Sequence, residues 1–315
     1  MEKKKQKRYF ALGAYEMDEQ MFAKGAYGTI HRCRRKGEKE EKYVVKKIDK
    51  SKDGLTTIEA EKNVSNLEKE GAEHLLRAIE MIDTKEAMYI ITKYCNMGNL
   101  EEYNNGKGVL TIDEVRCIFE MVADALNFLH KNNLGHRDMK CDNVLLHKKP
   151  DSNDFTAALT DFGFSTILDE KGVATTILGT MPMMSPELLN YEYTDKSVDI
   201  WAIGIMIYRT CFGKYPFATE NKMDFKTLVN HGDYVIPKYF IVSAECIHLL
   251  ERCLQHDHKR RLHASDVLEH PFFRRDVKDL YLCWTKEDVP MSTKRLRSPE
   301  EFEKWIPSVM EKLNP

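Results

Sequence analysis

Hydrophobic and polar positions alternate in short segments over the first ~90 residues of the chain. Three of these segments, 27–33, 43–48 and 88–92, are apolar and β-branched, as strands are. Apolar positions 58, 64 and 67 predict a weak helix between the second and third strands. The polar stretch 93–98 that follows predicts a linker, so we expect a boundary between two lobes there.

Helical periodicity dominates the rest of the chain. Thr111 and Glu114 form a capping box, and apolar positions continue behind it at helical spacing to Leu129. The segment 200–210 is apolar on nearly every side and predicts a buried helix that ends at Gly213. Further helices are predicted at 243–254, at 264–270 and, from the cap signal at 298–301, in the tail.

Composition and charge exclude several classes of protein. The chain has 315 residues, which is enough for one large domain or two lobes. Lys and Arg total 48 and Asp and Glu total 50, and the net charge of -2 argues against a nucleic-acid or membrane-surface binder. The longest apolar run, near 200–207, is far shorter than the ~20 residues of a membrane span.

The cysteines and the N-terminus indicate a compartment. The eight cysteines include no CxxC pair, which is typical of free thiols in a reducing environment. The basic N-terminus, MEKKKQKRYF, is followed by no apolar segment and is therefore not expected to be a signal peptide. Together these features predict a cytoplasmic protein.

Two segments of the first lobe carry candidate phosphate chemistry. Gly25 and Gly28 allow a backbone turn to approach phosphates closely, although hairpins with glycine are common. Lys46 lies inside an apolar strand, where a buried charge is costly unless it is paired. It can face water on an edge strand, or it can point at phosphate and a carboxylate, for which Glu61 is the natural candidate and Glu59 the alternative.

The segment 136–146 is the most informative part of the chain. It reads HRDMKCDNVLL, so ionisable groups and an amide stand between two apolar segments. Farther along, behind a strand predicted at 156–160, Asp161 opens the triplet Asp-Phe-Gly. Asp161 and Asn143 can supply the hard oxygen ligands that Mg²⁺ takes, and Asp138 can accept a hydroxyl proton.

These motifs, in this order and spacing, resemble those of eukaryotic protein kinases. The resemblance runs from about residue 9 to 273 and includes Ser-Pro-Glu at 185–187, where the family has Ala-Pro-Glu. Lys140, two residues after Asp138, is the form seen in serine/threonine kinases. The stretches HRDMKCDNVLL, DFGFS and RRLH resemble more closely the testis-specific serine/threonine kinase branch of the calmodulin-kinase-like group.

The resemblance implies an α+β, bilobal protein-kinase fold. The expected domain covers 9–273, with a β-rich N-lobe at 9–92, a hinge at 93–98 and a mainly helical C-lobe at 99–273; residues 274–315 form a tail with a short helix. It further implies transfer of the ATP γ-phosphate to protein substrates with Mg²⁺ as cofactor. Neither nucleic acid nor a membrane is expected as partner, and a monomer is expected.

Site residues follow from the same resemblance. Asp138, Lys140 and Lys46 are the expected catalytic residues, with Thr180 bracing the first two. Asn143 and Asp161 are expected to hold Mg²⁺. The expected nucleotide contacts are Ala23 (where the family has its first glycine), Gly25, Gly28, Ile30, Lys46, Glu61, Thr92, Tyr94, Asn143 and Asp161.

Supporting and regulatory residues are also implied. Glu187 and Arg261 resemble a structural ion pair of the family, and Asp199 is expected to accept backbone amides of the 136–138 loop. Phosphorylation of Thr176, or of the adjacent Thr175, is expected to order its segment against Arg137. Phe164 implies a preference for serine over threonine. The alternative is a pseudokinase or scaffold with weak ATP binding, which Ala23 and the uncertain glutamate favour.

Overall fold

The computed structural model describes residues 8–25, 28–68, 70–150, 154–167, 180–192, 194–237, 241–274, 281–283, 289–294, 300–301 and 304. Its contacts divide the chain into two units, 1–98 with 145–165 and 99–144 with 166–315. The first unit is built around a β-sheet and the second around helices, which confirms the predicted α+β class. Among the described residues, no helix is long and apolar enough to cross a membrane.

The sheet of the first unit has six antiparallel strands in the order β1-β2-β3-β4-β6-β5. The predicted strands are confirmed as β3, β4 and β6. The others were missed for two reasons: β2 has four exposed residues in succession, which hides the alternation, and β1 and β5 are only 4 residues long. The bounds are β1 Tyr9–Leu12, β2 Tyr15–Gly25, β3 Gly28–Arg35, β4 Tyr43–Asp49, β5 Glu80–Asp83 and β6 Ala87–Lys93.

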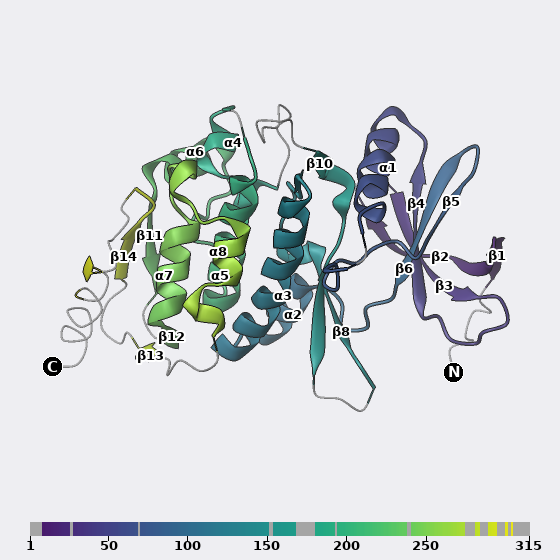
Figure 1. Cartoon of the computed structure of the whole chain (residues 1–315), viewed down its shortest axis with the longest axis horizontal. Coiled ribbons are helices and arrows are strands. Elements are labelled where there is room, and N and C mark those ends of the chain that lie inside the picture. Colours follow the sequence, from purple (N-terminus) through teal and green to yellow (C-terminus); the bar gives the residue numbers. More distant parts are fainter. Residues whose placement is uncertain are drawn as a thin grey trace. The chain divides into compact units, whose positions relative to one another are not determined.

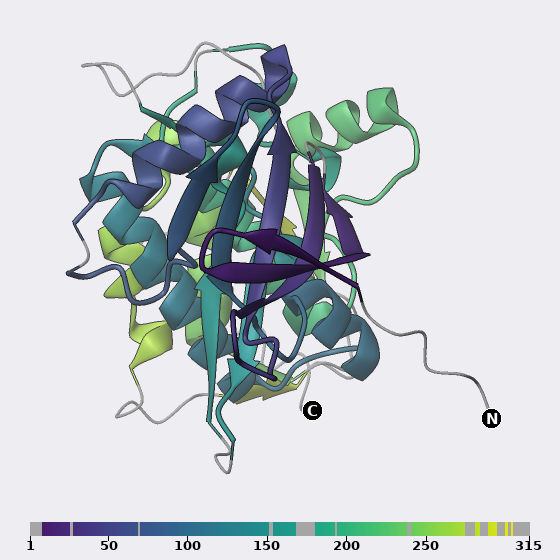
Figure 2. The ribbon, with the colours of Figure 1, turned by 90° about the vertical axis from the view of Figure 1, so that its right-hand side faces the viewer.

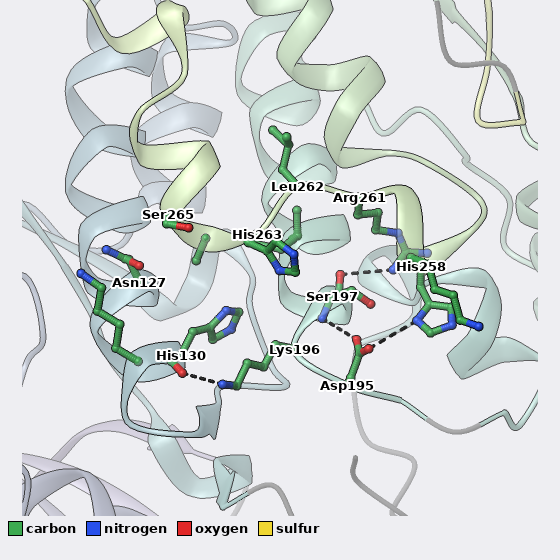
Figure 3. A pocket seen from close by; sticks show the side chains of 14 residues that line it. Asn127, His130, Asp195, Lys196, Ser197, His258, Arg261, Leu262, His263 and Ser265 are labelled. Carbon is green, nitrogen blue, oxygen red and sulfur yellow. Dashed lines mark hydrogen bonds and ion pairs between the residues drawn. The ribbon is translucent and has the colours of Figure 1, made fainter. Parts of the chain in front are cut away.

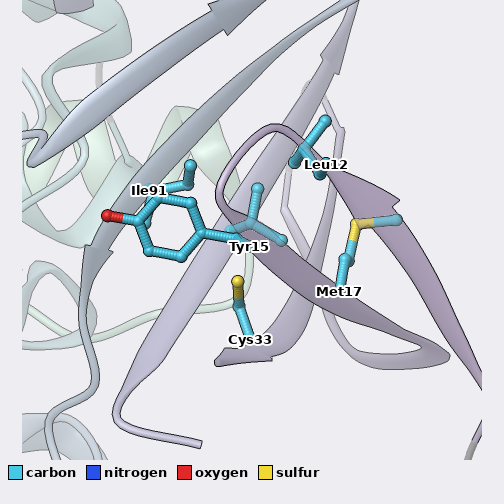
Figure 4. Packing of buried hydrophobic residues seen from close by; sticks show 6 residues of the cluster. Leu12, Tyr15, Met17, Cys33 and Ile91 are labelled. Carbon is cyan, nitrogen blue, oxygen red and sulfur yellow. The ribbon is translucent and has the colours of Figure 1, made fainter. Parts of the chain in front are cut away.

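The two faces of this sheet are buried against different partners. Successive side chains of a strand point to opposite faces, so Val45 and Ile91 lie on one face. There they pack with Leu12, Tyr15 and Cys33 (Figure 4). Ile48, Met88 and Ile90 lie on the other face and pack with Ile58 of α1, Lys52–Ser65 (Figure 2).

Helix α1 begins before the predicted apolar positions because Ser51 caps it. The Ser51 hydroxyl accepts a hydrogen bond from the Gly54 amide at 3.1 Å, and the polar first turn carries no hydrophobic signal. At the other end, the Arg77 guanidinium donates to the carbonyls of Ser65 at 2.8 Å and Glu68 at 2.7 Å. Free carbonyls at a helix end need donors, so Arg77 fixes where α1 stops.

Strands β8, Val144–Lys148, and β9, Phe155–Leu159, pair with each other. The strand predicted at 156–160 is thereby confirmed as β9. The sequence division placed 145–165 in the second lobe, but the structure groups it with the first unit. The reason is backbone hydrogen bonding: Leu159 donates to His74 and accepts from Leu76, each at 2.8 Å.

Helices make up most of the second unit. The predicted capping box is confirmed, since the Glu114 amide donates to Thr111 Oγ1 and the Thr111 amide to Glu114 Oε2. Helix α5 is buried along nearly its whole length and ends at Gly213, whose φ is 68°. Helices α2 and α6 were not predicted. The bounds are α2 Leu100–Lys107, α3 Ile112–Lys131, α4 Pro186–Leu189, α5 Ser197–Phe212, α6 Lys222–His231, α7 Ala244–Cys253 and α8 Ala264–Leu268.

Helix α5 packs against α3 and α7 in the second unit (Figure 1). Residues of the tail add two short strands to it: β13, Tyr281–Cys283, pairs with β12, Ile241–Ser243, and β14, Val289–Ser292, pairs with β11, Asp233–Ile236. The buried side chain of Met291 belongs to β14, so this part of the tail contributes to the core. The predicted cap at Ser298 lies outside the described residues.

Close packing of α5 on α7 gives a prediction for stability. A Cβ at Gly204 would lie 2.8 Å from Leu254 Cδ2 and 2.9 Å from Cys253 Cβ. We expect Gly204→Ala to lower the free energy of unfolding by about 1–3 kcal/mol, measured by urea denaturation. The control is Gly106→Ala in α2, where a Cβ meets nothing within 4 Å and helix propensity should add about 0.5–1 kcal/mol. Equal effects at the two positions would contradict the packing.

Candidate active site

Lys46 lies in a cross-strand row of the first-unit sheet. The register pairs Ala23 with Ile30, Ile30 with Lys46, and Lys46 with Ile90. Paired residues project on the same face, so Ala23, Ile30 and Lys46 lie on the face that α1 covers. Thr92, two residues after Ile90 on β6, belongs to this face as well.

The Lys46 amine contacts two carboxylates of the same unit. Its Nζ lies 2.9 Å from Glu61 Oε1 and 2.6 Å from Asp161 Oδ1. Burial lowers the pKa of Lys46, but the two carboxylates raise it further, so its pKa lies above the usual value and the amine stays charged. Glu61 is buried and Glu59 is exposed, which places Glu61 rather than Glu59 at the lysine.

Asp161 follows β9 in a left-handed backbone conformation, with φ at 62°. The 3-10 turn η2, Phe162–Phe164, comes next and packs against α1. A Cβ at Gly163 would lie 2.8 Å from Cγ2 of Thr57 in α1, so a larger residue does not fit there. The triplet Asp-Phe-Gly is thus shaped by the close approach of this turn to the helix that carries Glu61.

The two glycines of the β2–β3 hairpin differ in whether the structure leaves room for a side chain. A Cβ at Gly28 would lie 1.8 Å from the Lys47 carbonyl oxygen, so the β4 backbone excludes any side chain there. A Cβ at Gly25 would meet only the Gly28 carbonyl oxygen, at 3.7 Å. Residues 26 and 27, between them, lie outside the described residues. Gly28 is therefore required by the sheet itself, independently of any ligand.

Tyr94, expected at the nucleotide, contacts other residues of the first unit through its amide and its ring. Its amide donates to the Lys42 carbonyl at 2.9 Å. Its ring lies 3.3 Å from the Arg32 guanidinium carbon and contacts Phe22 edge-on, at 6.1 Å between centroids. Amide and ring are thus both engaged within the protein.

In the second unit, Asp138 is the centre of a polar cluster. Its Oδ1 accepts from Thr180 Oγ1 at 3.0 Å, and its Oδ2 lies 2.8 Å from Lys140 Nζ and 3.1 Å from Asn143 Nδ2. Asn143 comes from the 3-10 turn η1, Cys141–Asn143, and also donates to the Asp138 carbonyl at 2.8 Å. The structure thus brings together four residues that are up to 42 positions apart in the sequence.

Asp199 of α5 holds the backbone that carries this cluster. Its Oδ2 accepts from the His136 amide and its Oδ1 from the Arg137 amide, at 2.9 and 2.8 Å, as the sequence predicts. His130 Nε2 lies 2.9 Å from Oδ2. Burial raises the pKa of Asp199, but the hydrogen bonds from His130 and the Arg137 amide lower it overall, so the carboxylate stays ionised. Arg137 itself has φ at 67°, a strained value for a non-glycine residue.

The remaining predictions concern the Glu187–Arg261 ion pair, Arg137 and the two threonines at 175 and 176. Glu187 and Arg261 form the expected buried, bidentate ion pair, at 2.5 and 2.7 Å. Buried Arg137 donates to Thr166 Oγ1 at 3.3 Å. Thr175 and Thr176 lie outside the described residues.

Asn143 of the second unit and Asp161 of the first unit each carry a donor that suits Mg²⁺. Both hydrogen bonds of Asn143 use its Nδ2, so its amide oxygen takes no part in them, and Asp161 offers a carboxylate. Both are hard oxygen donors of the kind that Mg²⁺ takes, usually from only one or two protein groups. The described residues contain no cluster of three or more His, Cys, Asp and Glu that could hold a metal, so other metal centres have no support in this part of the chain.

This fold is the one expected of a kinase domain, and so are the Lys46 ion pairs and the Asp138 cluster. Comparison with protein families agrees. The family model described as protein kinase domain matches residues 17–273. The chain therefore belongs to the protein kinase family.

Three relatives named as serine/threonine kinases illustrate the similarity. The chain is 30% identical over 93% of its length to the human SNF-related serine/threonine-protein kinase. It is 30% identical over 87% of its length to the probable serine/threonine-protein kinase MARK-A of Dictyostelium discoideum, and 26% identical over 83% to the human serine/threonine-protein kinase ULK1. The matches span 37%, 25% and 25% of these relatives, respectively.

The ion pairs of Lys46 give a prediction that does not depend on activity. Lys46→Met leaves buried Glu61 without its cation, and we expect the free energy of unfolding at pH 8 to fall by about 1–3 kcal/mol in urea denaturation. The control is Lys47→Met, next along β4, whose amine pairs with exposed Asp49 and should contribute less than about 0.5 kcal/mol. A similar loss in both variants would show that the Lys46 pairs do not stabilise the fold.

Proposed function

We propose that this chain is a serine/threonine protein kinase that transfers the γ-phosphate of ATP to serine, and less readily threonine, hydroxyls of proteins. The Asp138 cluster carries this proposal: Lys140, Asn143 and Thr180 all contact the carboxylate that the reaction needs. The names of the relatives support the same reaction.

Asp138 has the chemistry of the residue that receives the substrate hydroxyl. A carboxylate held by several donors is fixed in orientation, and it can accept the proton as the oxygen attacks phosphorus. Lys140 lies beside it and can neutralise charge on the phosphoryl group in transit. The Thr180 hydroxyl donates to Asp138 and accepts from Lys140 at 3.3 Å, and these two hydrogen bonds hold the Asp138 and Lys140 side chains next to each other.

The nucleotide and metal roles follow from the donor sets. Lys46 is proposed to contact the ATP phosphates, and Asn143 and Asp161 are proposed to hold Mg²⁺. The bound metal supplies positive charge that offsets the negative charge of the phosphates. Ala23, Gly25, Gly28, Ile30 and Thr92 are proposed to line the nucleotide site, supported for Ala23, Ile30 and Thr92 by the sheet face that they share with Lys46.

Several finer features complete the proposal. We place the kinase domain at 9–273 and a tail at 274–315, with the lobes and hinge as expected from the sequence except that 145–165 is grouped with the first unit. The resemblance of its motifs to the testis-specific branch supports that subgroup. A monomer in the cytoplasm, acting on proteins without a nucleic-acid or membrane partner, agrees with the nearly neutral charge.

One of the two observations that favoured the pseudokinase alternative no longer supports it. It rested on Ala23 and on the uncertain glutamate, and Glu61 occupies the position at Lys46. Alanine at position 23 lies within a strand and leaves the Lys46 pairs and the Asp138 cluster intact. Turnover of ATP with Mg²⁺ distinguishes the two functions.

Removing the proposed proton acceptor tests the function directly. Asp138→Asn keeps the shape but removes the base, and we expect ATP-dependent phosphate incorporation into a generic protein to fall about 100-fold or more. The control, Asp142→Asn, makes the same change at an exposed position of the same turn and should keep most activity. Turnover of Asp138→Asn close to that of the unaltered chain would rule out the mechanism.

A phosphorylation switch is the second functional prediction. Phosphate on Thr176 or Thr175 would bring close to two negative charges, which suit the guanidinium of buried Arg137. Mass spectrometry of active protein should find the phosphate, and Thr176→Ala should lose activity while Thr227→Ala, on the exposed side of α6, should not. Full activity in protein shown to be unmodified at both threonines would refute the switch.

The choice of acceptor is the third. A bulky Phe164 should disfavour the rotamer that threonine needs, because the extra methyl group restricts χ1. Matched peptides that differ only in serine or threonine should react at rates that differ about tenfold. Phe164→Ile should reduce or reverse the ratio, whereas Phe10→Ile, at a half-exposed residue of β1, should leave it unchanged. Equal rates for the two peptides would contradict a role for Phe164.

A further inference from the structure

A cavity of about 560 Å³ lies within the second unit (Figure 3). It is bounded by the end of α3, the start of α5 and the segment that leads into α8. None of Asp138, Lys140, Asn143 and Thr180 lines it. Its size falls within the ~300–1,000 Å³ of ligand sites in proteins. We call this cavity the basic pocket.

The lining of the basic pocket is strongly cationic. Lys131, Lys196, Lys259 and Arg261 line it, and Asp195 is its single carboxylate residue. Arg261 is neutralised by its bidentate pair with Glu187. The three lysines form no ion pair with a carboxylate of the described residues, so they leave an excess of positive charge around one cavity.

Among the three lysines, Lys196 is held by two hydrogen bonds. Its Nζ donates to the His130 carbonyl at 2.6 Å and to Asn133 Oδ1 at 2.9 Å, which are both neutral acceptors. Burial lowers the pKa of Lys196, and nearby Asp195 offsets this only in part. An anion in the basic pocket would therefore stabilise this charge more than the protein does alone.

Uncharged donors lie beside the lysines. The Ser197 hydroxyl is buried and has no hydrogen-bond partner among the described residues. His263 and Ser265 also contribute their side chains to the lining (Figure 3). The Asp195 carboxylate accepts a hydrogen bond from the Ser197 amide at 2.8 Å and lies 3.4 Å from His258 Nδ1. The one carboxylate of the lining is therefore already engaged by groups other than the lysines.

We propose that the basic pocket binds a phosphate monoester, carried either by a phosphorylated residue of a protein or by a small metabolite. Three unpaired lysines match a dianion better than a single carboxylate, and lysine acts on phosphate as a point charge. The Ser197 hydroxyl adds a donor to a phosphate oxygen. The excess charge disfavours a cation, and the lysines and polar side chains disfavour a wholly apolar ligand.

Titration of the full chain with defined probes tests the proposal. The probes are inorganic phosphate, glycerol 3-phosphate, a phosphoserine peptide and the same peptide without phosphate. Binding is measured by calorimetry, and the ring resonances of His258 and His263, which line the basic pocket, show by nuclear magnetic resonance where each probe binds. We expect saturable binding of the phosphate-bearing probes with shifts of these resonances.

Paired variants separate the basic pocket from general charge. Lys131→Gln with Lys259→Gln removes two exposed lysines of the lining and should weaken phosphate binding about tenfold or more while leaving the fold intact. The control, Lys214→Gln with Lys222→Gln, makes the same change in net charge at exposed positions of the same unit outside the lining. It should bind as the unaltered chain does.

Each result decides the proposal. Tighter binding of the phosphopeptide than of glycerol 3-phosphate supports a protein-borne phosphate, and the reverse supports a metabolite. Equal binding of the two peptides, equal loss in both double variants, or no shift of the His258 and His263 resonances would overturn it. Displacement of the phosphate probes by short RNA with the same lysine dependence would also overturn it in favour of nucleic acid.

Discussion

A charge that leaves water raises the free energy of the folded protein unless other groups compensate for it, and both units are organised around such charges. In the first unit, Lys46 is compensated by Glu61 and Asp161. Each partner arrives on a different element, so the pairing fixes a strand, a helix and the turn after β9 relative to one another. In the second unit, Asp199 does the same for the loop that carries Asp138.

The same constraint explains where backbone strain is tolerated. Arg137 and Asp161 are non-glycine residues in left-handed conformations, which are unfavourable by themselves. Arg137 is held there by the hydrogen bond from its amide to Asp199, and Asp161 by the contact of its carboxylate with Lys46. Backbone strain thus lies next to residues proposed for catalysis, since Arg137 precedes Asp138 and Asp161 contacts Lys46. The three lysines of the basic pocket are the contrasting case, because no carboxylate of the described residues forms an ion pair with them.

Sequence reasoning succeeded where residue type carries the signal. The motifs that contain Asp138, Asn143 and Asp161 led to the protein kinase family, which the family model confirms, and the capping box at Thr111 marks the start of α3. It failed where the signal is not in the residue type. Strand β2 is too polar to show alternation.

The sequence by itself determined the α+β class, the helices with strong periodicity and the set of residues available for phosphoryl transfer, because each depends on local pattern. Only the tertiary structure decided that Glu61 rather than Glu59 meets Lys46. The number of residues between the helix and the next strand was uncertain, so the sequence did not determine which face of the helix is turned towards Lys46. The tertiary structure alone grouped 145–165 with the first unit, through backbone hydrogen bonds that no side chain announces. It also gathered Lys131, Lys196 and Lys259 around one cavity, because they lie on three segments whose proximity arises only when the helices pack.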